Sequence, residues 1–354
     1  MKETVRFQES AVHRLLRLAR TLADWRSEGH SARQLWNVVL CKGSMRRLVT
    51  KPWGKPYGLL IEPTSACNLR CPLCPTGRGT LGRRPGMMDM SLYSAILDES
   101  RHWVSRINLS NYGEPLLHPN IVEMIEMAKK CGIYVTLASN LHPLHTDELA
   151  DRLVASGMDY IYISFDGVDQ ETYVDYRRGG RFDTLVSAVR RLVDAKRKAG
   201  SRTPFIELQY IVMRHNEGRL DEFRRLAGEL GVDGIALKPL SFNNADWDDE
   251  AVLEEFRRRY PIEQAYHLYQ VDEGAIRWKA EKTKRVCLAL WYTLTVFSDG
   301  TVVPCCLDPR GELALGNARE GLLKAWYSER ACSLRFALKS GDGRPPVCSR
   351  CCGV

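Results

Sequence analysis

From about residue 57 the chain alternates short apolar runs with longer amphipathic segments, and this alternation constrains the fold more than any other feature. The apolar runs are typical of buried strands and lie at 58–64, 106–110, 133–138, 160–165, 205–213 and 234–239. Helical periodicity fills the gaps between them at 91–102, 119–131, 146–156, 183–199 and 218–230. Six alternating units form a parallel sheet with helices on its outer face. We therefore predict an α/β fold, a partial (βα)6 TIM-like barrel whose chemistry lies at the carboxyl ends of its strands.

Composition separates the rest of the chain from this barrel. Residues 1–56 contain twelve Lys and Arg against four Asp and Glu, so this arm carries the whole net charge of +8. Residues 241–280 are charged and helix-prone, and the later run TLTVFSDGTVVPCC has the Asp299-Gly300 turn of a hairpin. The predicted parts are a basic helical N-terminal arm (1–56), the barrel (57–240), a helical connector (241–280) and a small C-terminal α+β domain (281–354).

The basic arm fits two kinds of environment. Its apolar residues recur at helical spacing, with a second short helix expected over 31–40, which favours a helical pair packed on the main domain with a solvated basic face. The alternative is a surface that docks on an anionic membrane or a phosphorylated lipid carrier. No nucleic acid is expected, because basic residues do not interleave with aromatic ones.

Targeting signals are not evident in the chain. The longest uncharged stretch, residues 131–146, is shorter than a membrane-spanning helix, which needs about 17 to 25 apolar residues. The N-terminus lacks the basic start and apolar run of a secretory signal. We expect a cytoplasmic protein, with peripheral membrane contact through the arm as the alternative.

Three cysteines lie close together directly after the first predicted strand. The run SACNLRCPLCPTG, residues 65–77, contains Cys67, Cys71 and Cys74. Intracellular thiols in CxxC clusters more often bind metal than each other. Structural zinc needs four ligands, whereas three thiolates hold a [4Fe–4S] cluster that keeps one iron open for an outside ligand.

This cysteine spacing at the start of a βα series resembles the radical S-adenosylmethionine (SAM) enzymes. In that family the open iron binds SAM, and one electron from the cluster cleaves SAM to a 5′-deoxyadenosyl radical that abstracts hydrogen from a substrate. The resemblance implies a [4Fe–4S] cluster and SAM as cofactors and a flavodoxin- or ferredoxin-type protein as reductant.

Polar motifs after the later strands strengthen the resemblance. The run 111–115, NYGEP, resembles the Gly-Gly-Glu-Pro turn that receives the SAM amino group, with a tyrosine in place of the first glycine. A Ser-Asn pair and a Ser-x-Asp-Gly element follow the next two strands, and one of two consecutive arginines is a candidate bidentate partner of that Asp. The implied cofactor-binding residues are Tyr112, Gly113, Glu114, Pro115, Ser139, Asn140, Ser164, Asp166, Arg177, Arg178 and Asn216.

The C-terminal cysteines resemble the SPASM/twitch extension, which binds auxiliary iron–sulfur clusters. The spacing Cys287-x17-Cys305-x42-Cys348-x2-Cys351 implies one auxiliary [4Fe–4S] cluster with four protein ligands. Four cysteines would also suit a structural zinc site, which is the alternative. Two further thiols, Cys306 and Cys332, are candidate hydrogen donors to a substrate radical.

The sequence leaves several alternatives open for the reaction and for the substrate. An auxiliary cluster favours oxidation (dehydrogenation) or epimerisation of a sugar, an aminocyclitol or a lipid-linked small molecule. The alternative is a peptide-modifying SPASM enzyme, for which the arm looks too short to contain the usual peptide-recognition fold. A hypothesis of another class is a non-catalytic metal-binding scaffold.

Overall fold

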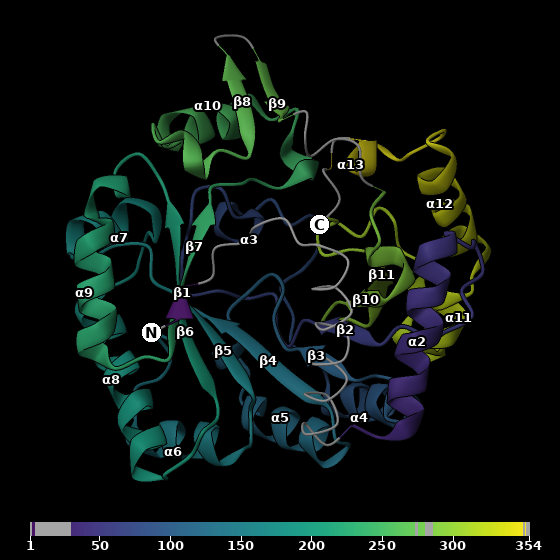
Figure 1. Ribbon diagram of the computed structural model, residues 1–354, viewed down its shortest axis with the longest axis horizontal. Coiled ribbons are helices and arrows are strands. Elements are labelled where there is room, and N and C mark those ends of the chain that lie inside the picture. Colours follow the sequence, from purple (N-terminus) through teal and green to yellow (C-terminus); the bar gives the residue numbers. More distant parts are fainter. Residues whose placement is uncertain (1, 4–29, 273–274, 280–285, 350, 352–354) are drawn as a thin grey trace, which may run out of the picture.

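The computed structural model describes residues 2–3, 30–272, 275–279, 286–349 and 351, and it confirms the predicted α/β barrel (Figure 1). Each predicted barrel strand pairs in parallel with the next one along the chain. The six strands are β2 (Gly58–Ile61), β3 (Arg106–Asn108), β4 (Tyr134–Ser139), β5 (Tyr160–Ser164), β6 (Phe205–Val212) and β7 (Gly234–Pro239). Their order in the sheet follows the sequence, so every crossover joins neighbouring strands.

The predicted helices lie on the outside of this sheet. They are α4 (Met90–Ser100), α5 (Ile121–Lys130), α6 (Asp147–Ala155), α8 (Phe182–Lys198) and α9 (Leu220–Leu230). Side-chain caps set several of their starts: the Thr146 hydroxyl, for example, accepts the Leu149 N–H at the start of α6. The sequence did not predict α7 (Gln170–Tyr176), which begins with a capping box between Asp169 and Thr172.

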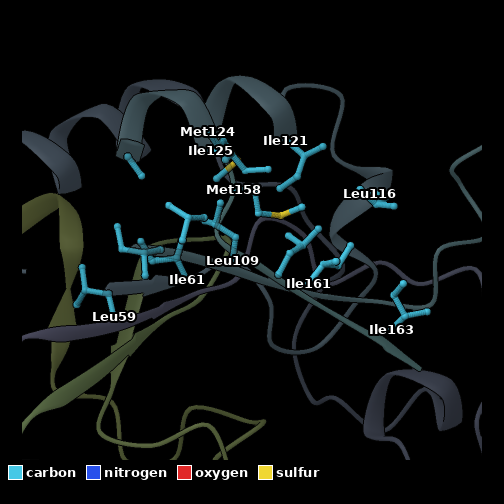
Figure 2. Packing of buried hydrophobic residues seen from close by; sticks show 14 of the residues in the cluster. Leu59, Ile61, Leu109, Leu116, Ile121, Met124, Ile125, Met158, Ile161 and Ile163 are labelled. Carbon is cyan, nitrogen blue, oxygen red and sulfur yellow. The ribbon is translucent and has the colours of Figure 1, made fainter. Parts of the chain in front are cut away.

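Alternation along the strands separates an apolar outer layer from a more polar interior. In Figure 2, Leu59, Ile61 and Ile161 of the strands pack with Met124 and Ile125 of α5. The alternate residues along the strands, such as Asn108 on β3 and Thr136 on β4, point to the opposite face of the sheet and are only partly buried. The inside of the barrel therefore has polar groups and room for a ligand.

Both ends of the chain extend the barrel sheet. The short strand β1 (Lys2–Glu3) pairs with β7, and β10 (Thr293–Val296) pairs in parallel with β2 at the opposite edge. The predicted hairpin is confirmed, with β11 (Thr301–Val303) antiparallel to β10, and β12 (Gly316–Asn317) follows it. The C-terminal segment thus shares the sheet of the barrel instead of forming a sheet of its own.

The sequence predicts a helical connector, but only part of this segment is helical. After η3 (Asn244–Asp246), α10 (Glu250–Arg259) and η4 (Gln264–Tyr266), it forms the two-stranded sheet β8 (Tyr269–Asp272) and β9 (Ala275–Trp278). Apolar residues alternate with polar ones here, and Tyr269 packs against Trp278 with ring centroids 4.2 Å apart. This cross-strand aromatic packing outweighs the helical propensity of the segment.

In the N-terminal arm, α2 (Ala32–Arg47) is longer than predicted, and the first predicted arm helix lies outside the described residues. The helix is fixed to the barrel: Gln34 and Asn37 donate to the backbone carbonyls of Val104 and Trp103 over 2.7 and 2.9 Å. The indole of Trp291 donates to the Val49 carbonyl over 2.7 Å. No helix in the described part of the chain is long and apolar enough to cross a bilayer.

All but one of the remaining elements are short. They are α3 (Pro75–Arg78), η1 (Pro115–Leu117), η2 (Glu217–Arg219), η6 (Ala289–Trp291), η7 (Ala318–Glu320), α11 (Leu322–Trp326), α12 (Glu329–Ser340) and α13 (Pro346–Ser349). Of these, α3 begins directly after Cys74, and Leu338 of α12 and Val347 of α13 line a pocket together with the C-terminal cysteines.

Candidate radical SAM and iron–sulfur site

The first cysteine loop follows β2 and places three thiols in a buried environment. Cys71 is 6% exposed, and Cys74 precedes the short helix α3. A side chain at Gly77 would lie 2.5 Å from the Cys71 carbonyl oxygen, so only glycine permits this tight fold of the loop. None of the cysteines in the described ranges forms a disulfide.

Burial makes two of these thiols poor acids by themselves. It raises the pKa of Cys67 to about 12, with a smaller opposing effect from the Leu69 N–H, and it also raises the pKa of Cys71. Thiolates form at such positions when a cation is bound, because the positive charge replaces lost hydration. Within the described residues no three His, Cys, Asp or Glu side chains are grouped around a single metal-ion position. Three thiols on one loop, one of them buried and two partly buried, fit a cluster in which each cysteine binds a different iron.

The turn after β3 is tied directly to this loop. Gly113 has φ +111°, and a Cβ there would lie 2.2 Å from the Thr64 carbonyl oxygen. The Glu114 N–H donates to the Ala66 carbonyl over 2.8 Å, next to the first cysteine. The predicted glycine is therefore required by its backbone conformation and by the close approach of the segment that follows β2.

The Glu114 carboxylate is buried and hydrogen-bonded. It accepts the Ser139 hydroxyl over 2.6 Å, the Asn140 N–H over 2.7 Å and the Leu116 N–H over 3.1 Å. Burial raises the pKa of Glu114 to about 7, although these donors oppose the shift. The predicted Ser-Asn pair and the predicted GEP turn are thus brought together, and Asn140 also donates to Asn68 on the cysteine loop over 2.9 Å.

The structure selects Arg177 as the partner of Asp166. Asp166 is fully buried, and both Nε and Nη2 of Arg177 lie 2.5 Å from its Oδ2 atom. The other carboxylate oxygen accepts the Ile211 N–H over 2.6 Å. Nη1 of Arg177 lies 3.5 Å from the Cys71 sulfur, so this ion pair connects the strand ends to the first cysteine loop.

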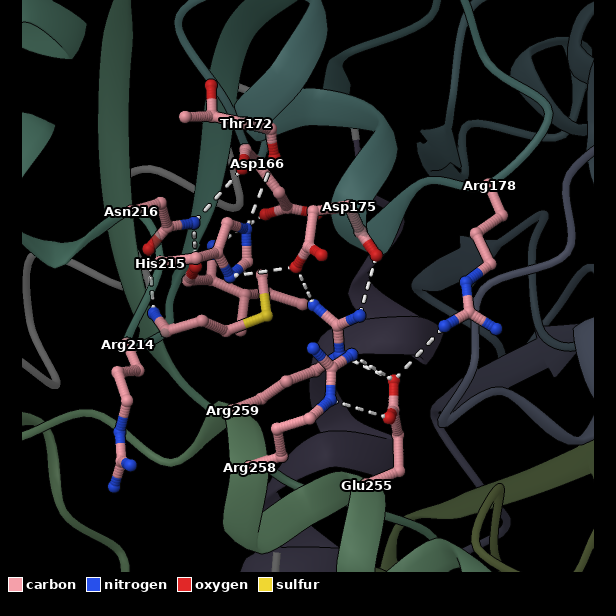
Figure 3. A network of polar contacts seen from close by, with 12 residues as sticks. Asp166, Thr172, Asp175, Arg178, Arg214, His215, Asn216, Glu255, Arg258 and Arg259 are labelled. Atoms are coloured by element: carbon pink, nitrogen blue, oxygen red, sulfur yellow. Dashed lines mark hydrogen bonds and ion pairs between the residues drawn. The ribbon is translucent and has the colours of Figure 1, made fainter.

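Arg178 and Asn216 take different places in the network that Figure 3 shows. Arg178 is exposed and points away from Asp166 toward Glu255, 3.5 Å distant. Asn216 is buried, and its amide donates to the backbone carbonyls of Asp166 and Ile211 over 3.0 Å. Its side chain therefore braces the chain beyond β5 and β6. Ser164 is partly buried at the end of β5, and Pro115 begins η1.

A cavity of about 310 Å³ opens among the inward-facing strand residues and is called the barrel cavity below. Cys305 and Cys306 line it together with Asn108, Thr136 and Tyr162. Of the two candidate hydrogen donors, the structure brings Cys306 to this cavity. Cys332 lies on α12, with its sulfur 4.0 Å from the Tyr327 carbonyl, and does not line the cavity.

The four C-terminal cysteines predicted as ligands line one pocket, here named the C-terminal cysteine pocket: Cys287, Cys305, Cys348 and Cys351. Leucines and Val347 form much of its wall. Burial raises the pKa of Cys348 to about 12, and the other three thiols add to the shift. Residues up to 64 positions apart thus converge on a thiol-rich, largely apolar pocket, which fits a second cluster with four protein ligands.

Sequence reasoning missed a buried ion pair beside the first loop. Glu62, directly after β2, is fully buried and accepts both terminal nitrogens of Arg83. Ser298, at the end of β10, donates its hydroxyl to the same carboxylate over 3.1 Å. The one available signal was a carboxylate at the end of an apolar strand run.

Tyr112 also has a role that the motif did not indicate. Its hydroxyl donates to the Cys306 carbonyl over 2.6 Å and accepts the Asn243 amide over 2.6 Å. The side chain thus reaches toward the C-terminal segment, and the predicted contact with SAM stays a prediction.

Comparison with known proteins agrees with this geometry. The radical SAM superfamily matches residues 61–227, and the SPASM iron–sulfur cluster-binding domain matches residues 287–352. The chain is 28% identical over 314 residues to a tungsten-containing aldehyde ferredoxin oxidoreductase cofactor-modifying protein of Pyrococcus furiosus, covering 83% of this chain and 86% of the relative. It is 27% identical to a PqqA peptide cyclase of Gluconobacter oxydans, covering 71% of this chain and 70% of the relative.

A solved structure shares the fold. Streptococcus suis SuiB bound to its precursor peptide SuiA matches with a TM-score of 0.57 at 15% identity, over 94% of this chain and 74% of that one. The radical SAM domain uses a [4Fe–4S] cluster and SAM, and the SPASM domain binds auxiliary iron–sulfur clusters. The chain belongs to the radical SAM superfamily and has a SPASM iron–sulfur cluster-binding domain at its C-terminal end.

Proposed function

We propose that this radical SAM enzyme modifies a peptide. The observation that supports this most is its similarity to a PqqA peptide cyclase along 71% of the chain. These relatives favour the peptide-modifying alternative over the sugar, aminocyclitol or lipid-linked substrate that the sequence suggested, and they do not support an oxidoreductase or epimerase type.

The residues around the first cysteine loop would bind the cofactors. Cys67, Cys71 and Cys74 would hold the first cluster, which together with SAM supplies a radical able to abstract hydrogen. Glu114, at the adjacent turn, offers a carboxylate near the place where the SAM amino group would bind. The ion pair of Asp166 and Arg177 would hold the strand ends in position around SAM.

The barrel cavity suits one side chain of a larger substrate. At about 310 Å³ it is at the small end of ligand pockets, so a peptide backbone would stay at the mouth while a side chain enters. Its walls carry polar groups: Asn108, Thr136 and Tyr162 offer hydrogen bonds, and Arg106 adds one positive charge. The C-terminal cysteine pocket, which shares Cys305 with this cavity, would hold the auxiliary cluster and so supply a redox centre beside the substrate.

The test begins with iron and SAM cleavage. Anaerobically reconstituted protein should contain about eight irons per chain and form 5′-deoxyadenosine with a chemical reductant. The Cys67/Cys71/Cys74→Ala variant should retain about four irons and form none. Cys131→Ala is the control, because Cys131 lies at the end of α5, outside both sets of predicted ligands.

The peptide assignment needs a separate measurement. Short synthetic peptides with deuterated side chains are incubated with the reconstituted enzyme, and deuterium is sought in 5′-deoxyadenosine. Deuterium transfer and a mass change of the peptide are the expected result. Transfer from deuterated sugars or aminocyclitols, with none from peptides, would reinstate the small-molecule substrate.

Two partners are also proposed. A flavodoxin- or ferredoxin-type protein would deliver the electron for SAM cleavage. An anionic membrane surface would contact the outer face of α2, where Trp36 is 63% exposed, and the segment just after the helix, where Trp53 is 49% exposed. Exposed Arg33, Arg46 and Lys51 lie on or just after the same helix, and tryptophan with basic residues is typical of a membrane-interface surface.

A further inference from the structure

The Tyr112 hydroxyl joins three segments that are far apart in the sequence. Tyr112 belongs to the turn after β3, Asn243 follows β7, and Cys306 follows β11. The Tyr112 hydroxyl donates a hydrogen bond to the Cys306 carbonyl and accepts one from the Asn243 amide. Barrel, connector and C-terminal segment therefore meet at this single group.

The phenol lies among cysteines of both proposed cluster sites. Tyr112 is partly buried, and the thiols of Cys306, Cys305 and Cys74 are its electrostatic neighbours. Cys74 belongs to the first loop, and Cys305 belongs to the C-terminal cysteine pocket. The hydroxyl therefore lies between the two sites and donates its hydrogen bond to the Cys306 carbonyl.

The backbone that accepts this hydrogen bond carries two consecutive thiols that hydrogen-bond to each other and line partly different spaces. Cys305 lines both the C-terminal cysteine pocket and the barrel cavity, whereas Cys306 lines the barrel cavity and is absent from the pocket wall. A peptide unit that shifts at Cys306 would move both thiols, because they are consecutive residues.

We propose that Tyr112 is a positioning residue that couples the two cluster sites. Through the Cys306 carbonyl it holds Cys305 in place as a ligand of the auxiliary cluster and directs Cys306 to the barrel cavity. Hydrogen bonds beyond the ligands orient them and tune the potential of the cluster. The inference rests on the proposed function in one respect, since it takes the C-terminal cysteine pocket as a cluster site.

Tyr112→Phe removes the hydroxyl and keeps the ring. The midpoint potential and the electron paramagnetic resonance signal of the auxiliary cluster should shift relative to the wild type. Tyr93→Phe is the matched control, because the Tyr93 hydroxyl donates to the buried Met124 carbonyl over 2.9 Å on α5. An auxiliary potential equal in wild type, Tyr112→Phe and Tyr93→Phe would overturn the proposal.

A second readout does not depend on the clusters. In cluster-free protein, iodoacetamide should alkylate Cys306 faster in Tyr112→Phe than in the wild type or in Tyr93→Phe. Asn243→Asp should act like Tyr112→Phe, because a carboxylate in place of the amide donor competes with the Cys306 carbonyl for the hydroxyl proton. Equal alkylation rates in all four proteins would contradict the positioning role.

The two readouts separate the inference from the proposed function. Wild type with about four irons and no auxiliary signal would remove the second cluster site. Faster alkylation of Cys306 in Tyr112→Phe than in the wild type would still support the role of Tyr112 in positioning this segment.

Discussion

At the residue scale, local motifs predicted candidate site residues but not all of the contacts that these residues make. The predicted GEP turn and Ser-Asn pair meet at the Glu114 carboxylate, as their positions after successive strands implied. The sequence could not choose between Arg177 and Arg178 for Asp166. That choice depends on the end of α7, where the two consecutive side chains diverge and only Arg178 faces Glu255 of the connector.

The raised pKa of Glu114 predicts a pH dependence of stability. The pKa of an unfolded glutamate is 4.5, whereas the pKa of folded Glu114 is about 7. Between these values the unfolded chain loses its proton first, so the free energy of unfolding falls as pH rises and levels off above about 7. The shift corresponds to roughly 3 kcal/mol.

Glu114→Gln removes this titration. Anaerobic thermal melts from about pH 5.5 to about pH 8 should show the stability advantage of the wild type shrinking as pH rises through 7. The variant itself is expected to be less stable, because an amide cannot accept all three hydrogen bonds. A wild-type advantage that is constant with pH would contradict the assigned shift.

At the element scale, periodicity predicted most of the barrel, because each βα unit is a local pattern. The predicted strand 234–239 is reproduced, and the helix predicted over 183–199 is observed at Phe182–Lys198. Pairing between distant segments was beyond this reasoning. The sequence of β10, TLTV, does not indicate by itself that this strand pairs with β2. That pairing depends on packing and on contacts with the distant Glu62 carboxylate.

Arg83→Leu tests the attachment of the C-terminal hairpin to the barrel. The Arg83 side chain pairs with Glu62, donates to the Pro309 carbonyl over 3.0 Å and lies 4.0 Å from the Phe297 ring centroid. Its loss would leave a buried carboxylate without its cation, at a cost of about 3 to 5 kcal/mol. We expect a lower melting temperature and faster proteolysis of the C-terminal segment.

The neighbouring residue provides the control for this change. Arg84 is exposed, and Arg84→Leu removes the same charge from the same loop. Equal melting temperatures for the two variants would mean that the ion pair does not hold the hairpin in place.

At the scale of the whole molecule, the parts are more integrated than composition suggested. The arm and the C-terminal segment were predicted as additions to a barrel, yet α2, the barrel and the C-terminal helices share contacts. The indole of Trp326 donates to the Gly54 carbonyl over 3.1 Å, and Arg335 donates to the Leu290 carbonyl over 2.9 Å. Charge and periodicity describe segments one at a time, so they could not indicate these contacts.

This integration determines how membrane binding should be tested. Truncation of the arm would remove α2, whose Val38 and Cys41 are buried, and would disturb the fold. Reversal of exposed charges avoids the problem. We expect the triple change Arg33→Glu, Arg46→Glu and Lys51→Glu to weaken binding to phosphatidylglycerol vesicles.

The expected size follows from the charge. At roughly 1 kcal/mol for each basic residue near an anionic surface, the loss should be on the order of a hundredfold in affinity. The same number of reversals on exposed α8, at Arg190, Arg197 and Lys198, is the control and should have less effect, because no exposed tryptophan accompanies those residues in the described part of the chain. If both triple variants float with anionic vesicles as the wild type does, the outer face of α2 is a solvated basic surface.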